Sequence, residues 1–352
     1  MFGPKFIILF FLLALVSCTT EKQVEPVLSR IAFGSCLKIE NSTDLLWDSI
    51  RSSKPNLFIF AGDNVYADSS DPSVLQKYYR KLANEAGFRR LRSMVPLLAV
   101  YDDHDYGLDN GGKENPIREE AAKACLDFFQ VPANDPRRTR EGIYGSYSYG
   151  PLGKRVQVIL LDTRYFRDSL VEVKRELGRY GPNKDPQATM LGQDQWAWLE
   201  KTLQKPADIR LIVSSIQVIP DKRGFESWGN FPHERQTLFN LIKSTKASGV
   251  LFLSGDSHFS EVSCYKGGDY PLYDVTSSAM AHHHNTKDGK PTKYSSFPNE
   301  YRVKGSEYTA GNFGLISIDW QGEDTMIQIE LKSIAGSSYF THSVKLKDLQ
   351  SK

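Results

Sequence analysis

Six short apolar runs, each followed at once by polar side chains, are the feature that most limits how this chain can fold. Each run has the length of one β-strand. The six runs with their polar ends are RIAFGSC, NLFIFAGDNVY, VPLLAVYDDHD, RVQVILLDTR, IRLIVSSIQ and GVLFLSGDSH. Continuous apolar runs of this length are typical of strands that are buried on both faces of a sheet. In such sheets ligands bind at the carboxyl ends of the strands, so the pattern predicts a site at that edge.

Helical patterns separate the apolar runs. The five segments with helical periodicity are residues 44–53, 72–86, 117–129, 192–203 and 233–244. Strands that alternate with helices predict an α/β fold. From Glu261 onward strand patterns dominate, and residues 285–311 are predicted to form a surface loop.

The amino terminus is typical of a secreted lipoprotein. Residues 1–17 carry one cation, Lys5, followed by the apolar run 6–16, which is shorter than the roughly 20 residues of a membrane-spanning helix. The run ends in LVSC, which resembles the lipobox of bacterial lipoproteins and makes Cys18 the predicted lipidation site. A short membrane anchor with an incidental cysteine is the alternative.

The rest of the chain is expected to be a polar tether, residues 18–29, and a single catalytic domain, residues 30–352. This organisation predicts an extracytoplasmic protein that is anchored to a cell-envelope membrane through Cys18. The formal net charge is +2, from 44 basic and 42 acidic residues, so no global field favours nucleic acid. We expect a monomer without a specific nucleic-acid partner.

Three motifs at the predicted strand ends carry the residues of a metal centre. VYDDHDYG holds three carboxylates and a histidine in four consecutive positions, and these carboxylates repel one another unless a cation lies among them. GDNVY and GDSH add carboxylates, a phenol and an imidazole. Such oxygen and nitrogen donors suit metal sites that generate hydroxide, and two cations about 3.5–4 Å apart clamp both oxygens of a displacement at phosphorus. The motifs therefore predict metal-dependent chemistry at phosphorus.

Seven segments in a fixed order resemble the alkaline phosphatase D family of metallophosphoesterases, which is related to the purple acid phosphatases. They are FGSC, GDNVYAD, DDHD, LDTRYFR, LGQDQWAWLEKTL, LSGDSH and DVTSSAMAH. The resemblance implies a four-layer sandwich of two mainly mixed β-sheets flanked by helices. It also implies a phosphoric ester hydrolase that attacks phosphodiesters, phosphomonoesters or both with a metal-bound hydroxide.

The resemblance assigns four residues to a pair of cations. Asp63 would be the carboxylate that bridges them, and Cys36 and Tyr66 would bind Fe³⁺ through a thiolate and a phenolate. Asp103 occupies the place where relatives carry an Asn or Asp ligand to the second cation. A buried small side chain is the alternative for Cys36, and a core aromatic is the alternative for Tyr66.

The later motifs extend this assignment. Asp256 and His258 fall where many metallophosphoesterases have two histidines, and the aspartate indicates an oxygen-rich second site that suits the Ca²⁺ family members bind beside iron. His104 takes the place of the histidine that faces the leaving group, and His282 aligns with a histidine of the family's late loop, which we assign to substrate binding. Arg164 would capture phosphate with its planar guanidinium and act in catalysis, with a structural role as the alternative.

Several neighbouring residues stay outside the predicted site. Asp102 and Asp105 are expected to cap a helix or to support a ligand through hydrogen bonds. Gln217 lies where the wider superfamily often has a metal-binding histidine, and it is left out of the ligand set. His283 and His284 are expected to belong to a loop, with an auxiliary ion as the alternative.

Other functions remain open at this point. A nuclease-type enzyme should show a basic groove, which the balanced charge does not indicate. A phospholipase-type enzyme is compatible with a lipid tether, which would keep it near its substrate. A non-catalytic lipoprotein that binds metal or phosphate would need the ligands without an acid, and His104 argues against it.

Overall fold

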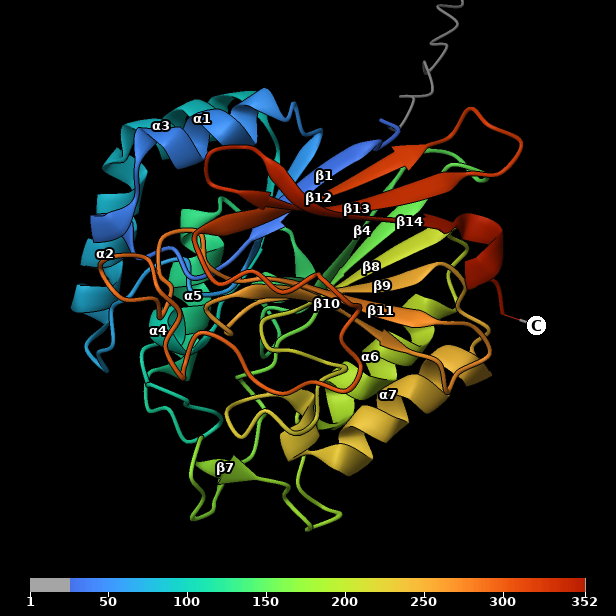
Figure 1. Ribbon diagram of the computed structural model, residues 1–352. Coiled ribbons are helices and arrows are strands. Elements are labelled where there is room, and N and C mark those ends of the chain that lie inside the picture. The colour runs from blue at the N-terminus through green and yellow to red at the C-terminus, as the bar shows by residue number, and fades with distance from the viewer. Residues whose placement is uncertain (1–25, 352) are drawn as a thin grey trace, which may run out of the picture.

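Two β-sheets stacked face to face, with helices on their outer sides, form the framework of the protein (Figure 1). The computed structural model describes residues 26–351. The predicted signal peptide and Cys18 lie outside the described residues. The predicted α/β sandwich of two mixed sheets flanked by helices is confirmed.

The first sheet is parallel at one side and antiparallel at the other. Its strands in spatial order are β14 (Ser338–Lys345), β13 (Met326–Ser333), β12 (Asn312–Asp319), β1 (Arg30–Gly34), β2 (Leu57–Ala61) and β3 (Leu97–Val100). β1, β2 and β3 pair in parallel, and β12 joins β1 in antiparallel register. Because parallel neighbours need a crossover, helices connect these strands, and the carboxyl ends of β1, β2 and β3 meet at one edge. The crossover helices are α1 (Asp44–Ser52), α2 (Pro72–Asn84) and α3 (Ala86–Met94).

The second sheet repeats this plan. Its strands in spatial order are β10 (Ser260–Tyr265), β11 (Leu272–Ser277), β9 (Val250–Ser254), β8 (Ile209–Ser214), β5 (Val156–Leu160) and β4 (Gly145–Tyr149). The four inner strands are parallel, and the two edge strands are antiparallel to their neighbours. The helices α6 (Gly192–Leu203) and α7 (Pro232–Ser244) cover the outer face of this sheet (Figure 1).

The helix predictions need correction at one place. The predicted helix 72–86 corresponds to α2, which ends at Asn84, and the sequence did not predict α3, which begins after extended backbone at Glu85. The DDHD motif begins the one-turn helix α4 (Asp103–Tyr106), for which Asp102 is the N-cap and Asp105 completes a capping box. The predicted capping roles of Asp102 and Asp105 are thus confirmed.

The remaining elements are short or lie in connections. They are α5 (Arg118–Phe128), the hairpin β6 (Val171–Glu172) and β7 (Tyr180–Gly181), and the 3₁₀ turns Ile39–Asn41, Pro136–Arg138, Trp228–Asn230 and Leu346–Leu349. Residues 285–311 contain no helix or named strand, as predicted for a surface loop.

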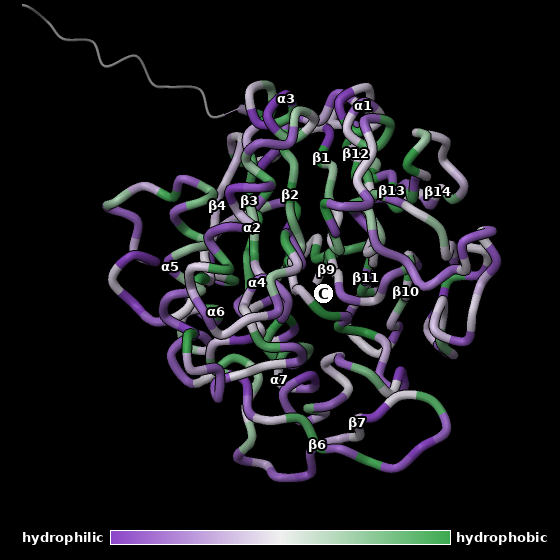
Figure 2. The backbone as a smooth tube through the Cα atoms, turned by 90° about the vertical axis from the view of Figure 1, so that its left-hand side faces the viewer, coloured by the Kyte–Doolittle hydropathy of each residue, from purple (hydrophilic) through white to green (hydrophobic). Residues whose placement is uncertain are grey.

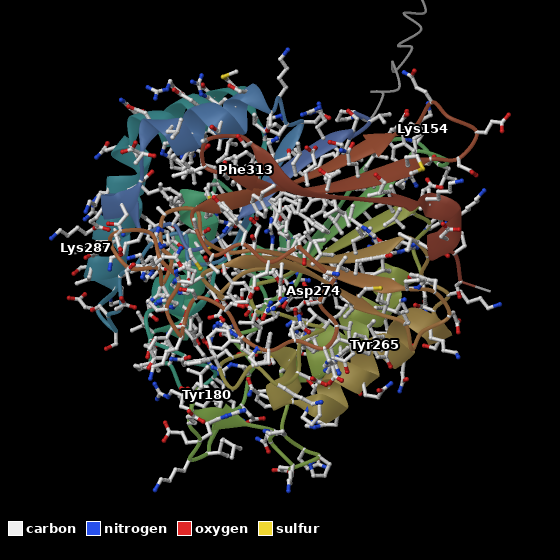
Figure 3. The ribbon with its side chains drawn as sticks, in the orientation of Figure 1. Lys154, Tyr180, Tyr265, Asp274, Lys287 and Phe313 are labelled. Carbon is white, nitrogen blue, oxygen red and sulfur yellow. The ribbon has the colours of Figure 1, made fainter. Side chains whose placement is uncertain are left out.

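The apolar strands bury side chains on both faces. In β2, Ile59 and Ala61 face the core between the sheets, whereas Phe58 and Phe60 face a second core beneath the outer helices. Phe313 of β12 belongs to that second core and is labelled in Figure 3. This two-sided burial explains why the strand reads LFIFA without polar alternation. In residues 26–351, no helix has both the length and the apolar character that a membrane span requires.

Candidate metal centre

The predicted ligands come together at the edge where the parallel strands end. α4 lies at this edge, which faces the viewer in Figure 2. Cys36 follows β1, Asp63 follows β2, Asp103 follows β3 and Asp256 follows β9. Strands from both sheets therefore deliver their polar ends to one place, although the ligands are up to 220 positions apart in the sequence.

Asp63 lies at the centre of the cluster. The Cys36 thiol donates to Asp63 Oδ2 at 3.3 Å, and the Tyr66 hydroxyl donates to the same oxygen at 3.1 Å. Donor atoms of Cys36, Asp63 and His258 lie within 4.8 Å of one another, as do those of Asp63, Asp103 and His104. Asp63 thus belongs to two adjoining sets of potential ligands, which is the position of a bridging carboxylate.

A third set of donors adjoins the first two. Donor atoms of Asp102, Asp103 and Asp256 also lie within 4.8 Å of one another. This set contains oxygen only, whereas the Cys36 set contains sulfur, nitrogen and oxygen. Hard cations such as Ca²⁺ prefer oxygen, and iron accepts thiolate and imidazole. The two ends of the site therefore offer different chemistry.

The backbone at the predicted ligands is strained. Cys36, Asp63, Asp256 and His258 have φ angles of 57°, 52°, 64° and 62°, the left-handed region that residues with a Cβ seldom adopt. Each such residue costs about 1–3 kcal/mol, and such strain collects at functional sites. Gly62 has a φ of 98°, and a Cβ there would lie 2.6 Å from Cβ of Asp102. The Gly-Asp turn thus lets two strand ends approach closely.

Buried atoms without hydrogen-bond partners show that the side chains suit a cation. Among the described residues, these atoms include Asp63 Oδ1, Asp102 Oδ2, Asp103 Oδ1 and His258 Nδ1. Leaving one such group unsatisfied costs about 1–3 kcal/mol or more. Carboxylate oxygens and an imidazole nitrogen are metal ligands, so the residues present fit a metal centre.

The charges of the site also favour a cation. Burial raises the pKa of Asp63 well above its usual value, and Asp103 and Asp105 raise it further against the opposing charge of His104. Burial and the Asp63 charge raise the pKa of the Cys36 thiol in the same way. A bound cation reverses this effect, because it stabilises the anionic forms.

His104 is held at the rim of the cluster. Its Nδ1 pairs with the Asp68 carboxylate, and its side chain is 19% exposed. Burial alone would lower the pKa of His104, but the charges of Asp103 and Asp63 and the hydrogen bond with Asp68 raise it to about 11. These neighbouring carboxylates therefore favour the protonated imidazole.

Arg164 does not have the placement expected of a phosphate ligand. Its side chain is fully buried, and Nε donates to Asp102 Oδ1 at 2.6 Å. Its two terminal nitrogens donate to Glu226 at 2.6 and 2.9 Å. With both edges of the guanidinium engaged by protein carboxylates, the geometry supports the structural alternative, in which Arg164 positions Asp102.

Arg223 is a site residue that the sequence did not reveal. Its Nη1 forms an ion pair with Asp256 and donates to the Glu226 carbonyl at 3.0 Å. Its guanidinium carbon lies 5.8 and 5.3 Å from the ring centres of Phe225 and Phe297. Arg223 lies in an irregular loop after β8, where no strand-end motif marks it.

The remaining candidates divide into two groups. His282 joins the site, with its ring centre 4.2 Å from that of His258 and 5.1 Å from that of Tyr66. Gln217 does not join the site, because its amide donates to Glu261 at 2.8 Å and to Thr276 at 3.0 Å. Gln217 therefore lies outside the ligand set.

Comparison with known proteins agrees with the architecture. Alkaline phosphatase D of Bacillus subtilis (strain 168) is 23% identical over 269 residues, a match that covers 65% of this chain and 46% of that protein. The chain thus matches less than half the length of this curated relative. The solved structure of PhoD superposes with a TM-score of 0.71 at 16% identity, covering 93% of this chain and 72% of that chain.

A second solved structure shares the fold, and a family model covers most of the chain. GAP50, described as the anchor in the inner membrane complex of Plasmodium, gives a TM-score of 0.56 at 14% identity, covering 93% of this chain and 90% of that one. The model of the PhoD-like phosphatase family matches residues 31–283. This match contains all the strand-end motifs described above, and the chain therefore belongs to the PhoD-like phosphatase family.

Proposed function

We propose that this protein hydrolyses phosphate esters at a centre of two cations that share Asp63. The observation that carries the proposal is the membership of Asp63 in both the Cys36–His258 set and the Asp103–His104 set of donors. Two cations joined by one carboxylate suit in-line displacement at phosphorus. Membership in the PhoD-like phosphatase family supports the same reaction.

The donor chemistry supports Fe³⁺ on one side and Ca²⁺ on the other. Cys36, Tyr66 and His258 would hold the iron, and Asp103 and Asp256 would hold the calcium. The cations, when bound, activate water and neutralise charge on the phosphoryl oxygens.

His104 is the proposed acid for the leaving group. Asp68 engages Nδ1, so Nε2 is the ring nitrogen that can donate a proton to the departing oxygen. Arg223 is the proposed partner for a phosphoryl oxygen, because its ion pair with Asp256 holds it beside the oxygen-rich donors. The aromatic rings of Phe225 and Phe297 restrict where its guanidinium can move.

Exchanging each arginine for lysine separates the two roles. Arg164→Lys removes the bidentate contact with Glu226 and weakens the pairing of buried Asp102. We expect the free energy of unfolding to fall by an amount that approaches the roughly 3–5 kcal/mol that breaking a buried ion pair costs. The KM for a phosphate ester should stay unchanged. Arg223→Lys should raise KM and cost less stability than Arg164→Lys, because Arg223 pairs with one carboxylate and Arg164 with two. Denaturant unfolding and steady-state kinetics measure both, and a raised KM in Arg164→Lys alone would contradict this division.

Soluble phosphate esters are the proposed substrates. Arg30 begins β1 at one edge of the sheet, and Cys36 follows β1 at the opposite edge. A tether that precedes Arg30 would therefore leave the domain from the edge opposite to the site.

A substrate panel tests the proposed function. Aryl phosphomonoesters, aryl phosphodiesters, phospholipid vesicles and DNA are assayed with the protein supplied with iron and calcium. Hydrolysis of the soluble aryl esters is the expected result. Activity on DNA or vesicles alone would favour the nuclease-type or phospholipase-type alternative, and no hydrolysis would favour a non-catalytic binding protein.

We also propose that Cys18 is lipidated and that the protein is anchored outside the cytoplasm. The LVSC motif supports this location. In cells given a labelled lipid precursor, the unaltered protein should take up label and Cys18→Ala should not. Equal labelling of the two proteins would refute the proposal.

A further inference from the structure

Three histidines gather on the solvent side of the candidate metal centre. The ring centre of His258 lies 4.2 Å from that of His282 and 4.4 Å from that of His284. Nitrogen atoms of the three rings lie within 4.8 Å of one another. The neighbouring His283 is not in this group, and its Nδ1 accepts the Asn285 backbone N–H at 3.3 Å.

The backbone holds this imidazole cluster, His258, His282 and His284, in place. The N–H of Ala281 donates to the Cys36 carbonyl at 3.1 Å, which ties the loop before His282 to the end of β1. The His284 carbonyl accepts from the Thr292 hydroxyl at 2.9 Å. The backbone N–H of His258 donates to the Ser278 hydroxyl at 3.0 Å. The three histidines therefore come from two segments, which these contacts hold in place.

Two buried nitrogen atoms of the imidazole cluster have no hydrogen-bond partner among the described residues. His258 is only 7% exposed, and its Nδ1 has no hydrogen-bond partner among the described residues. The Nδ1 of His282 is likewise buried and without a partner there. Buried imidazoles normally find a partner, so these nitrogens point to a ligand that accepts their lone pairs.

The three imidazoles indicate which cations the cluster would bind. Imidazole suits zinc, copper and nickel better than calcium or magnesium, and three histidines with one water form a common tetrahedral zinc site. Zinc–nitrogen bonds of about 2.0–2.1 Å place ligand atoms about 3.4 Å apart. A shift of somewhat over 1 Å in the loop that carries His282 and His284 would bring the three nitrogens to that spacing.

His258 belongs to this cluster and to the set with Cys36 and Asp63. A neutral imidazole has only one nitrogen with a free lone pair, so His258 serves one cation at a time. We propose that His258, His282 and His284 form a second binding site for Zn²⁺, and that zinc bound there inhibits the enzyme by withdrawing His258 from the catalytic cations. The inhibitory part rests on the proposed phosphatase function, whereas the binding site does not.

A zinc titration of the full chain, loaded with iron and calcium, tests this inference. Equilibrium dialysis with elemental analysis counts bound zinc, and hydrolysis of an aryl phosphate is followed in the same samples. The unaltered protein should bind one zinc ion and lose activity in step with it. His284→Gln should weaken zinc binding by at least about tenfold, equivalent to about 1.4 kcal/mol, and should keep its activity before zinc is added.

His283→Gln is the matched control, because it removes the adjacent histidine that lies outside the cluster. It should bind zinc and be inhibited like the unaltered protein. Equal zinc binding by His284→Gln, or zinc binding without inhibition, would overturn the inference. If no form hydrolyses the ester before zinc is added, the proposed function fails, while the zinc counts of the two variants still decide whether the site exists.

Discussion

Asp63→Asn is expected to abolish binding of both cations and to reduce phosphate-ester hydrolysis by at least about 100-fold. The carboxylate belongs to two donor sets, so its loss should affect both cations. Replacing a residue that only hydrogen-bonds to a metal ligand already lowers metal affinity or activity by about 10–100-fold, and loss of a shared ligand should cost at least as much. The folded chain should survive the change. Asparagine tolerates the left-handed backbone at this position, where φ is 52°. The change also removes one negative charge from a group of neighbouring carboxylates that repel one another. Metal analysis and kinetics on the purified variant measure the effect.

Asp274→Asn is the matched control for that experiment. Asp274, labelled in Figure 3, is also a fully buried aspartate, but it lies within β11. It accepts hydrogen bonds from Val218, Ile219 and Ser254 and belongs to none of the donor sets. This variant should be less stable yet keep both cations. If Asp63→Asn retains two cations and normal activity, Asp63 does not bridge them.

His104→Ala is expected to slow the hydrolysis of alkyl phosphate esters by about 10²–10⁴-fold, the usual contribution of a general acid. An alkoxide is a poor leaving group and needs a proton in the transition state, whereas nitrophenolate leaves with little help. The loss should therefore shrink on nitrophenyl esters. Parallel assays of both ester types, with metal analysis of the same preparation, measure this difference.

His342→Ala provides the comparison, because His342 lies in the edge strand β14 and contributes to none of the donor sets. It should leave the ratio of the two rates unchanged. Loss of a cation in His104→Ala would make His104 a ligand, as its place in the donor set with Asp63 and Asp103 permits. An equal loss of hydrolysis rate on both esters would show that His104 is not the acid for the leaving group.

The sequence predicted the framework where local pattern and burial agree. Strands such as β2 are apolar on both faces because each face meets a separate core. The first and last residues of these strands can therefore be predicted from the sequence. The convergence of Cys36 and Asp63 follows from the shared direction of the parallel strands β1 and β2, whereas Asp256 comes from the second sheet and joins them because the two sheets stack with these ends together. The predicted helix 72–86 overran the end of α2, and α3 was missed, because extended backbone at the single residue Glu85 stops one helix and a second begins directly after it.

The roles of the arginines could not be read from the sequence. Arg164 follows a strand toward the ligand edge, but its burial depends on Glu226, 62 positions away. Arg223 lies in a loop without periodicity, and only the folded chain places it beside Asp256. The imidazole cluster likewise depends on contacts between loops that follow two different strands, β9 and β11.

Removal and restoration of the metal ions tests the central claim most directly. The purified protein is stripped with a chelator, its iron and calcium contents are measured, and hydrolysis of an aryl phosphate is followed as each cation is returned. We predict that the stripped protein is inactive and that activity returns together with two bound cations per chain. A stripped protein that remains folded, free of metal and fully active would contradict a metal centre built on Asp63.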